Sequence, residues 1–116
     1  FDALLSLAKI LEVMAAENVR LSSLLSMVPK FYMSKRTVEC PWEDKGKVMR
    51  MLIEQVRGEK VELIDGIKVY HDTGWALILP DSEEPLFHVY SEASTSADAE
   101  ALREMYMAKI DEIRAT

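Results

Sequence analysis

The side chains best suited to chemistry in this sequence lie in the short segment "LPDSEEP", between two apolar runs. Asp81, Glu83 and Glu84 place three carboxylates in one tight connection. Several carboxylate oxygens are what a hard cation prefers, and they could equally face an Arg on another domain. Asp and Ser are also favoured in β-turns, so a solvated turn over residues 80–83 is the simpler alternative.

The other reactive side chains are isolated in the sequence. His71 and His88 each lie near a predicted strand, without a second His or Cys at zinc-ligand spacing, so we expect structural histidines, partly buried or on the surface. Cys40 is the single cysteine, which excludes an intramolecular disulfide and favours a reducing, cytoplasmic setting. We expect a buried, unreactive thiol there rather than a nucleophile. Without a Gly-rich phosphate loop, GxSxG or HExxH motif, the residues suggest no catalytic or metal-binding assignment.

Composition and charge narrow the class of protein. Hydrophobic residues make up 49% and charged residues 29% of the 116 residues, the balance of a globular domain. The net charge is −6, and residues 81–116 carry the whole surplus, with 3 basic and 9 acidic side chains. A nucleic-acid surface needs clustered Lys and Arg, so no nucleic-acid partner is expected. No apolar run approaches the roughly 20 residues of a membrane span, so no membrane partner is expected either.

Two helices are predicted before residue 30. Residues 2–16 repeat apolar side chains at helical spacing, on a face broader than a small surface helix needs. That face could pack in the core of the same domain or, in part, against material outside this sequence. A short second helix is predicted from Ser22, a natural N-cap, to just before Pro29. Because the sequence opens at Phe1, inside a helical pattern and without an initiator Met, we expect a fragment of a longer protein.

A strand and a helix are predicted next. "KRTVEC" (35–40) alternates and contains β-branched residues, which indicates a short strand ended by Pro41. "EDKGKVMRMLIEQV" (43–56) has helical spacing, with Gly58 just past its end. The seven methionines fall partly on inward helix positions, where we expect core fillers rather than a partner-binding face.

The remaining residues read as strands followed by a helix. A two-residue type I′ turn is predicted at Asp65-Gly66, where both positions want positive φ. A helix is predicted over residues 95–114, with Ser96 or Asp98 as its cap. The predicted strands are 60–64, 67–71, 75–79 and 86–92. The predicted inner stripe of the last helix is Leu102, Met105, Tyr106, Ile110 and Ile113.

This order predicts an α+β fold. Short connections imply antiparallel strands in meander order, and two helices can cover one face of such a sheet. We therefore predict a four-stranded antiparallel sheet with helices packed on one face.

The stretch "IDGIKVYHDTGWALILPDSEEPLFHVYSEA" resembles the C-terminal domain of the α-D-phosphohexomutases, the phosphoglucomutase/phosphomannomutase family. Family members carry an Asp-Gly hairpin, a strand with Trp, a loop reading R-P-S-G/N-T-E-P and a strand ending in VYxEA. The matching residues here are Asp65, Gly66, Trp75, Pro80, Glu84, Pro85, Val89, Tyr90, Glu92 and Ala93. The opening "DALLSLAKILEVMAAENVRLSSLLSMVPKFY" is similar to the end of the family's third domain.

The resemblance implies two parts. Residues 1–33 would be a helical segment at the end of the preceding mutase domain. Residues 34–116 would be the C-terminal domain, with a phosphoglucomutase C-terminal-domain-like, TATA-box-binding-protein-like fold.

In the family, the matching loop holds the phosphate of the sugar phosphate, and the domain swings to close the active site. The resemblance places this phosphosugar loop at Leu79, Pro80, Asp81, Ser82, Glu83, Glu84, Pro85 and His88. Leu79 stands where the family has an Arg, while Asp81 and Glu83 stand where it has Ser and Thr. Ser82 takes the Gly/Asn position, and His88 replaces a further Arg. The prolines and Glu84 would keep the loop's shape.

These departures predict a degenerate phosphate loop. An Arg fork and hydroxyl donors suit a phosphate, whereas an alkyl chain and carboxylates do not. Like charges about 4 Å apart repel by about 1 kcal/mol in water and about 4 kcal/mol in a partly screened site. A hexose phosphate is therefore a possible but doubtful ligand of this loop.

The resemblance also implies a parent enzyme. It would be an intramolecular phosphotransferase, moving a phosphoryl group between the 1- and 6-positions of a hexose with Mg²⁺ and a phosphoserine held by other domains. This sequence contains none of those catalytic residues, so we expect it to be inactive alone, with other domains of the same chain as its partners. The alternative is a non-catalytic structural or regulatory module, for example in a sugar-1-phosphate nucleotidyltransferase fusion, whose loop carboxylates contact a basic patch on a neighbouring domain.

Overall fold

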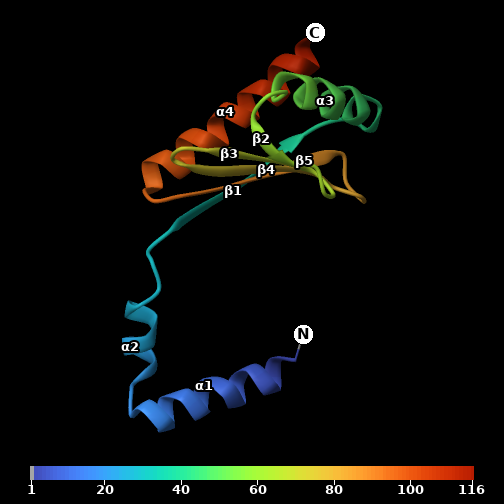
Figure 1. Cartoon of the computed structure of the whole chain (residues 1–116). Coiled ribbons are helices and arrows are strands. Elements are labelled where there is room, and N and C mark those ends of the chain that lie inside the picture. The colour runs from blue at the N-terminus through green and yellow to red at the C-terminus, as the bar shows by residue number, and fades with distance from the viewer. Residues whose placement is uncertain (1) are drawn as a thin grey trace. The chain divides into compact units, whose positions relative to one another are not determined.

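A computed structural model describes residues 2–116, and Phe1 lies outside the described residues. The chain divides into two compact units, one ending at Lys30 and one running from Phe31 to Thr116. The first unit contains two helices, and the second contains a sheet and two helices (Figure 1).

The first unit consists of α1 (Ala3–Glu17) and α2 (Leu21–Ser26). α1 begins after Asp2, whose Oδ1 accepts a hydrogen bond from the Leu5 amide at 2.9 Å, and ends at Asn18 in a left-handed conformation. The predicted Ser22 cap of α2 is wrong, because Arg20 takes that position without a side-chain hydrogen bond. Neither helix contains a buried residue.

The second unit is built on an antiparallel sheet with strand order β1-β5-β4-β3-β2. Its elements are β1 (Tyr32–Glu39), α3 (Trp42–Gln55), β2 (Lys60–Glu62), β3 (Ile67–His71), β4 (Gly74–Pro80), β5 (Leu86–Ala93) and α4 (Ser96–Ala115). The predicted meander is present from β2 to β5, and the α+β class is confirmed.

The predicted number of four strands is wrong, since the sheet has five. β1 joins as an edge strand beside β5, with Tyr32 opposite Ala93 and Glu39 opposite Leu86. These partners are far apart in the sequence. Alternation within β1 reveals a strand but carries no information about which distant strand it pairs with, because side-chain periodicity is a local property.

The predicted type I′ turn is also wrong. β2 stops at Glu62 and β3 begins at Ile67, so four residues, 63–66, make the connection. Asp65 has a φ of 58°, but Gly66 does not have positive φ. A Cβ on Gly66 would lie 2.5 Å from the Ile78 carbonyl oxygen, so the glycine permits a close approach to β4 rather than a left-handed turn.

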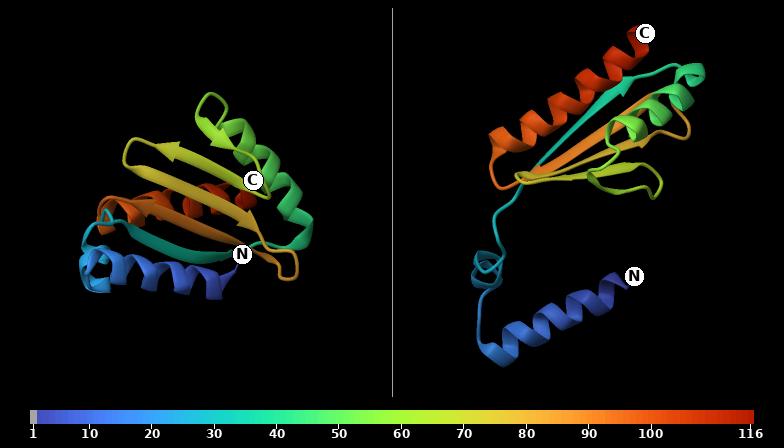
Figure 2. Two further views of the ribbon diagram at one scale, coloured as in Figure 1. Left: turned by 60° about the horizontal axis from the view of Figure 1, so that its bottom comes forward. Right: turned by 45° about the horizontal axis from the view of Figure 1, so that its top comes forward.

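α3 and α4 both cover one face of this sheet (Figures 1 and 2). Each fully buried large aliphatic side chain contributes about 1.5–3 kcal/mol of stability through the hydrophobic effect. The buried core consists of Val38, Cys40, Val48, Leu52, Val56, Ile67, Val69, Ala76, Ile78, Phe87, Val89, Tyr106, Ile110 and Ile113. Met49, Met51 and Met107 pack against it as expected, whereas Met27, Met33 and Met105 are exposed, so the prediction of core fillers holds for only part of the methionines.

α4 follows the predicted stripe with two differences. Its N-cap is Thr95, whose Oγ1 accepts a hydrogen bond from the Asp98 amide at 3.1 Å, so neither Ser96 nor Asp98 is the cap. Met105 is 39% exposed and lies outside the inner stripe. The other four predicted stripe residues are buried.

The other face of the sheet carries half-buried aromatic side chains with lysines stacked on them. The Lys68 ammonium lies 4.4 Å from the centroid of the Trp75 ring, and the Lys35 ammonium lies 5.0 Å from that of Tyr90. Within residues 2–116, no helix is long and apolar enough to cross a membrane.

Candidate functional site

The predicted phosphosugar loop joins β4 to β5. Leu79, near the end of β4, lies directly opposite His88 in the antiparallel register. Pro80 closes β4 and pairs with Phe87. The backbone returns at once, because the Asp81 amide donates to the Leu86 carbonyl oxygen at 3.1 Å. We call residues 80–85 the 80–85 loop.

The Asp81 carboxylate forms the centre of this loop. Its Oδ1 accepts hydrogen bonds from the backbone amides of Glu83 and Glu84, each at 2.8 Å. Its Oδ2 lies 2.8 Å from Nε2 of His88, which reaches it from β5. Three donors from two parts of the chain therefore converge on one carboxylate.

These contacts keep Asp81 ionised. The hydrogen bond from the Glu83 amide, followed by those from His88 and the Glu84 amide, lowers the pKa of the Asp81 carboxyl to about 2. An ionised carboxylate can only accept hydrogen bonds, so Nε2 of His88 carries the proton and donates it.

Lys45 of α3 also contacts the loop, which the sequence did not predict. Its ammonium donates to the carbonyl oxygens of Asp81 at 2.6 Å and Glu84 at 2.5 Å. The side chain is buried and lies 3.8 Å from the centroid of the Trp42 ring. A signal existed in the sequence, because Lys45 shares the inward face of α3 with Val48, a position where a lysine needs a polar partner.

The remaining loop residues have no such central contacts. The side chains of Ser82, Glu83 and Glu84 are exposed, so only the backbone of the two glutamates enters the cluster. Pro85 is exposed, and its carbonyl oxygen accepts from the Cys40 amide at 2.7 Å, which ties the loop to the end of β1.

The structure bears on two of the alternatives predicted for this loop, the solvated turn and the cation site. The exposed side chains of residues 82–85 fit a solvated turn, and Lys45 and His88 add contacts to it. Among residues 2–116, no three His, Cys, Asp or Glu side chains gather in a way that could hold a metal ion. The loop is thus a fixed structure around a carboxylate that already has its donors.

The two other reactive side chains lie elsewhere. Nε2 of His71, at the end of β3, is 2.9 Å from the Tyr106 hydroxyl of α4. This contact ties the sheet to a helix, as expected of a structural histidine. Cys40 is a buried free thiol. Burial raises the pKa of this thiol, so less of it is present as the reactive thiolate.

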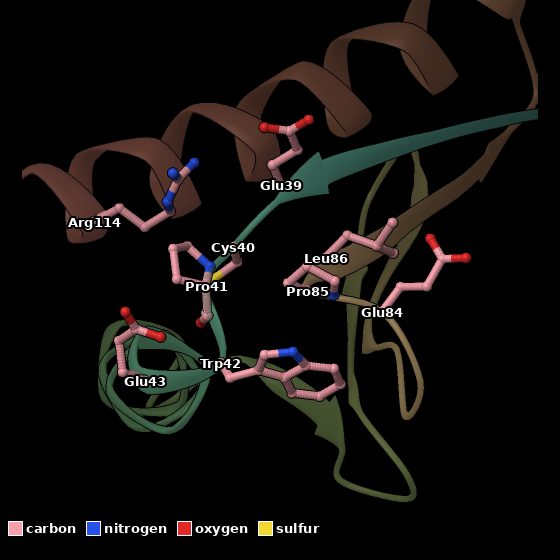
Figure 3. Close-up of a pocket in the computed structure, with 9 residues that line it drawn as sticks. All are labelled: Glu39, Cys40, Pro41, Trp42, Glu43, Glu84, Pro85, Leu86 and Arg114. Carbon is pink, nitrogen blue, oxygen red and sulfur yellow. The ribbon is translucent and has the colours of Figure 1, made fainter.

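A pocket of 530 Å³ borders the loop on the side of α3 and the end of α4 (Figure 3). Its lining comprises Glu39, Cys40, Pro41, Trp42, Glu43, Glu84, Pro85, Leu86 and Arg114. Three of these residues carry carboxylates, and the single guanidinium, that of Arg114, already contacts Asp111 at 3.2 Å. The pocket is therefore poorly suited to an anion such as a phosphate.

Comparison with known proteins identifies relatives of the chain, although no protein-family model matches it. It is 34% identical over 108 residues to a probable phosphoglucosamine mutase of Methanopyrus kandleri, covering 91% of this chain and 24% of that protein. It is 28% identical over 112 residues to a phosphoglucomutase/phosphomannomutase of Thermococcus kodakarensis, covering 96% of this chain and 25% of the relative. A phosphoglucosamine mutase of Methanocaldococcus jannaschii is 32% identical over 108 residues, or 89% and 24% of the two chains.

The chain thus spans about a quarter of the length of the curated relatives it matches. The resemblance to the phosphoglucomutase/phosphomannomutase family is confirmed by these relatives, which match about nine-tenths of the chain. The chain is a homologue of one part of the phosphoglucosamine mutases and of the phosphoglucomutase/phosphomannomutase that it matches.

Proposed function

We propose that this chain is the closing, phosphosugar-facing domain of a phosphohexomutase whose 80–85 loop no longer grips phosphate through its side chains. The observation that carries this proposal is the Asp81 carboxylate, bound by the amides of Glu83 and Glu84 at 2.8 Å each. The loop keeps a fixed shape, but an internal carboxylate uses the donors that an incoming phosphate would need.

The parent reaction would move a phosphoryl group between the 1- and 6-positions of a hexose or amino-hexose. The names of the relatives, phosphoglucosamine mutase and phosphoglucomutase/phosphomannomutase, support this substrate class. Mg²⁺ is proposed for the parent on the resemblance alone. Among the described residues, no three His, Cys, Asp or Glu side chains lie close enough together to bind it, so its ligands would come from other domains.

In this proposal the domain contributes shape and closure rather than chemistry, and other domains of the same chain are its partners. It would work in the cytoplasm, where the unpaired and buried Cys40 thiol stays reduced.

A segment exchange tests the function. The matching quarter of the Methanopyrus kandleri enzyme is replaced by this chain, and interconversion of the 6- and 1-phosphates of glucosamine and glucose is measured. We expect a folded chimera with mutase activity and a raised KM. A folded chimera no more active than the relative lacking the segment would contradict the proposal and favour a non-catalytic module.

A matched control restores the family loop within the chimera. The substitutions Leu79→Arg, Asp81→Ser, Ser82→Gly and Glu83→Thr return the R-P-S-G-T-E-P pattern. We expect the KM to fall by on the order of tenfold or more, because each charge-assisted hydrogen bond to phosphate contributes about 1.5–3 kcal/mol. An unchanged KM would mean that this loop does not face the phosphate.

A further inference from the structure

We propose that the pocket between the start of α3 and the end of α4 is a docking site for an arginine side chain of a partner polypeptide. The pocket shares only Glu84 and Pro85 with the 80–85 loop, so its occupant is independent of the function proposed above. An apolar lining, a half-exposed tryptophan and several carboxylates together point to this occupant.

The pocket has the dimensions of a side-chain binding site. Its volume of 530 Å³ falls within the range of about 300–1,000 Å³ that is typical of ligand pockets. Its walls come from the end of β1 and the turn after it, the start of α3, the end of the 80–85 loop with the start of β5, and the end of α4 (Figure 3). These segments all belong to the second compact unit, so the pocket lies within one unit of the chain.

The apolar part of the lining suits the stem of a long side chain. It consists of Pro41, Trp42, Pro85 and Leu86. Trp42 is 52% exposed, and the Lys45 ammonium, 3.8 Å from the ring centroid, covers one face of its ring. The rest of the indole is open to a partner. An arginine fits such a surface, because its planar guanidinium stacks on aromatic rings and its methylene groups pack against apolar side chains.

The charges around the pocket favour a cation. The lining residues with carboxylates are Glu39, Glu43 and Glu84. None of these carboxylates forms an ion pair with another residue of the range 2–116. The two nearby cations already have partners, since Arg114 contacts Asp111 at 3.2 Å and the Lys45 ammonium donates to the Asp81 carbonyl oxygen at 2.6 Å. An added cation therefore meets acidic side chains that have no counter-ion in the described chain.

The spread of the carboxylates favours a guanidinium over a metal ion. In the view of Figure 3, Glu39, Glu43 and Glu84 lie on different sides of the Trp42 ring. They do not converge, because no three His, Cys, Asp or Glu side chains of residues 2–116 are placed to hold a metal ion. A guanidinium has five donors in a rigid fork and can reach acceptors on more than one side. All three glutamates are exposed, so a polypeptide can lie across the rim while its arginine enters.

Titration of the 116-residue chain with a capped tripeptide that has a central arginine tests this inference. The matched peptide carries citrulline, which keeps the shape of arginine and lacks its charge. Chemical shifts of the Trp42 indole N–H and of the Glu43 and Glu84 amides report on the pocket. We expect saturable shifts with the arginine peptide and binding of the citrulline peptide weaker by about threefold to tenfold. Equal binding of the two peptides, or no shift at these three residues, would overturn the inference.

Substitutions on the rim separate docking from general charge attraction. Glu43→Gln and Glu84→Gln each remove one carboxylate from an exposed side chain, so both variants should fold. We expect each to weaken binding of the arginine peptide by about twofold to fivefold and to leave the citrulline peptide unaffected. Glu100→Gln is the matched control, because Glu100 is exposed near the start of α4 and does not line the pocket. An equal loss of affinity in Glu100→Gln would overturn the inference, since net charge alone would then explain the binding.

Discussion

Helices α1 and α4 show how differently two amphipathic helices can use their apolar faces. Both follow the 3.6-residue repeat, and both begin at a side-chain cap, Asp2 and Thr95 respectively. α4 buries five residues against the sheet and α3, whereas α1 buries none. An apolar stripe therefore predicts a helix and its inner face, while burial depends on the surface that another element offers.

The largest change in the free energy of unfolding is expected for a substitution on the buried face of α4. Ile110 of α4 is fully buried, and Ile110→Ala should lower the free energy of unfolding by about 2–5 kcal/mol because it leaves a cavity. Urea unfolding followed by circular dichroism measures the change. A loss below about 0.5 kcal/mol would show that α4 is not part of the cooperative core.

Lys45 extends the comparison to α3, where a polar side chain occupies an inward position. Lys45→Met keeps the apolar stem but removes the donors to the Asp81 and Glu84 carbonyl oxygens. We expect a loss of about 1–3 kcal/mol and faster amide exchange in the 80–85 loop. Lys47→Met, at a position without this contact, is the control and should change neither quantity appreciably.

The hydroxyl of Tyr106 tests the polar contact between α4 and β3. Tyr106→Phe should cost about 1 kcal/mol through loss of the hydrogen bond with His71. Burial raises the pKa of Tyr106 to about 12, so its neutral form stabilises the fold below about pH 10, and this contribution is lost as the pH rises through 12. Spectroscopic titration should therefore lose its highest tyrosine phase in the variant, and retention of that phase would contradict the assignment.

The Asp81 carboxyl gives a more local effect at low pH. Its pKa is depressed, so its stabilising contacts are complete above the ordinary value of 3.8 and are lost as the pH falls toward about 2. The Glu83 and Glu84 amide shifts should titrate together with a midpoint near 2. A shared midpoint at or above 3.8 would mean that the observed hydrogen bonds do not hold the carboxylate in solution.

The smallest change in the free energy of unfolding is expected for a substitution on the exposed apolar face of α1. Ile10 is 43% exposed, and Ile10→Ala should change the free energy of unfolding by no more than about 0.5 kcal/mol. The same substitution at Ile110 is its matched partner. A loss at Ile10 as large as that at Ile110 would show that the face of α1 is buried in solution.

Much of the second unit could be predicted from the sequence because its signals are local. The four-residue spacing of Leu102, Tyr106 and Ile110 indicated the inner face of α4, and all three are buried. Met105 satisfied the same apolar criterion yet is 39% exposed, because the stripe is narrower than the set of apolar residues. Turn chemistry at Asp65-Gly66 was ambiguous, since Gly also serves close backbone approaches.

The position of the 80–85 loop could be predicted from its residues, but the hydrogen bonds of the Asp81 carboxylate could not. Residue types alone left three alternatives open for Asp81: a cation ligand, a contact with an Arg on another domain, and a solvated turn, which was the simplest. Its carboxylate instead accepts the amides two and three residues ahead, which is a conformational choice that Asp makes often but not always.

By itself, the sequence indicated most of the helices and strands and the α+β class, and it carried the resemblance from which the phosphosugar loop is predicted. Only the tertiary structure decided that β1 lies beside β5, that Lys45 holds the loop and that His88 completes the ring of donors around Asp81. The physical reason is the range of the interactions. Periodicity and capping act within a few residues, whereas these contacts join segments whose proximity is fixed by packing of the whole unit.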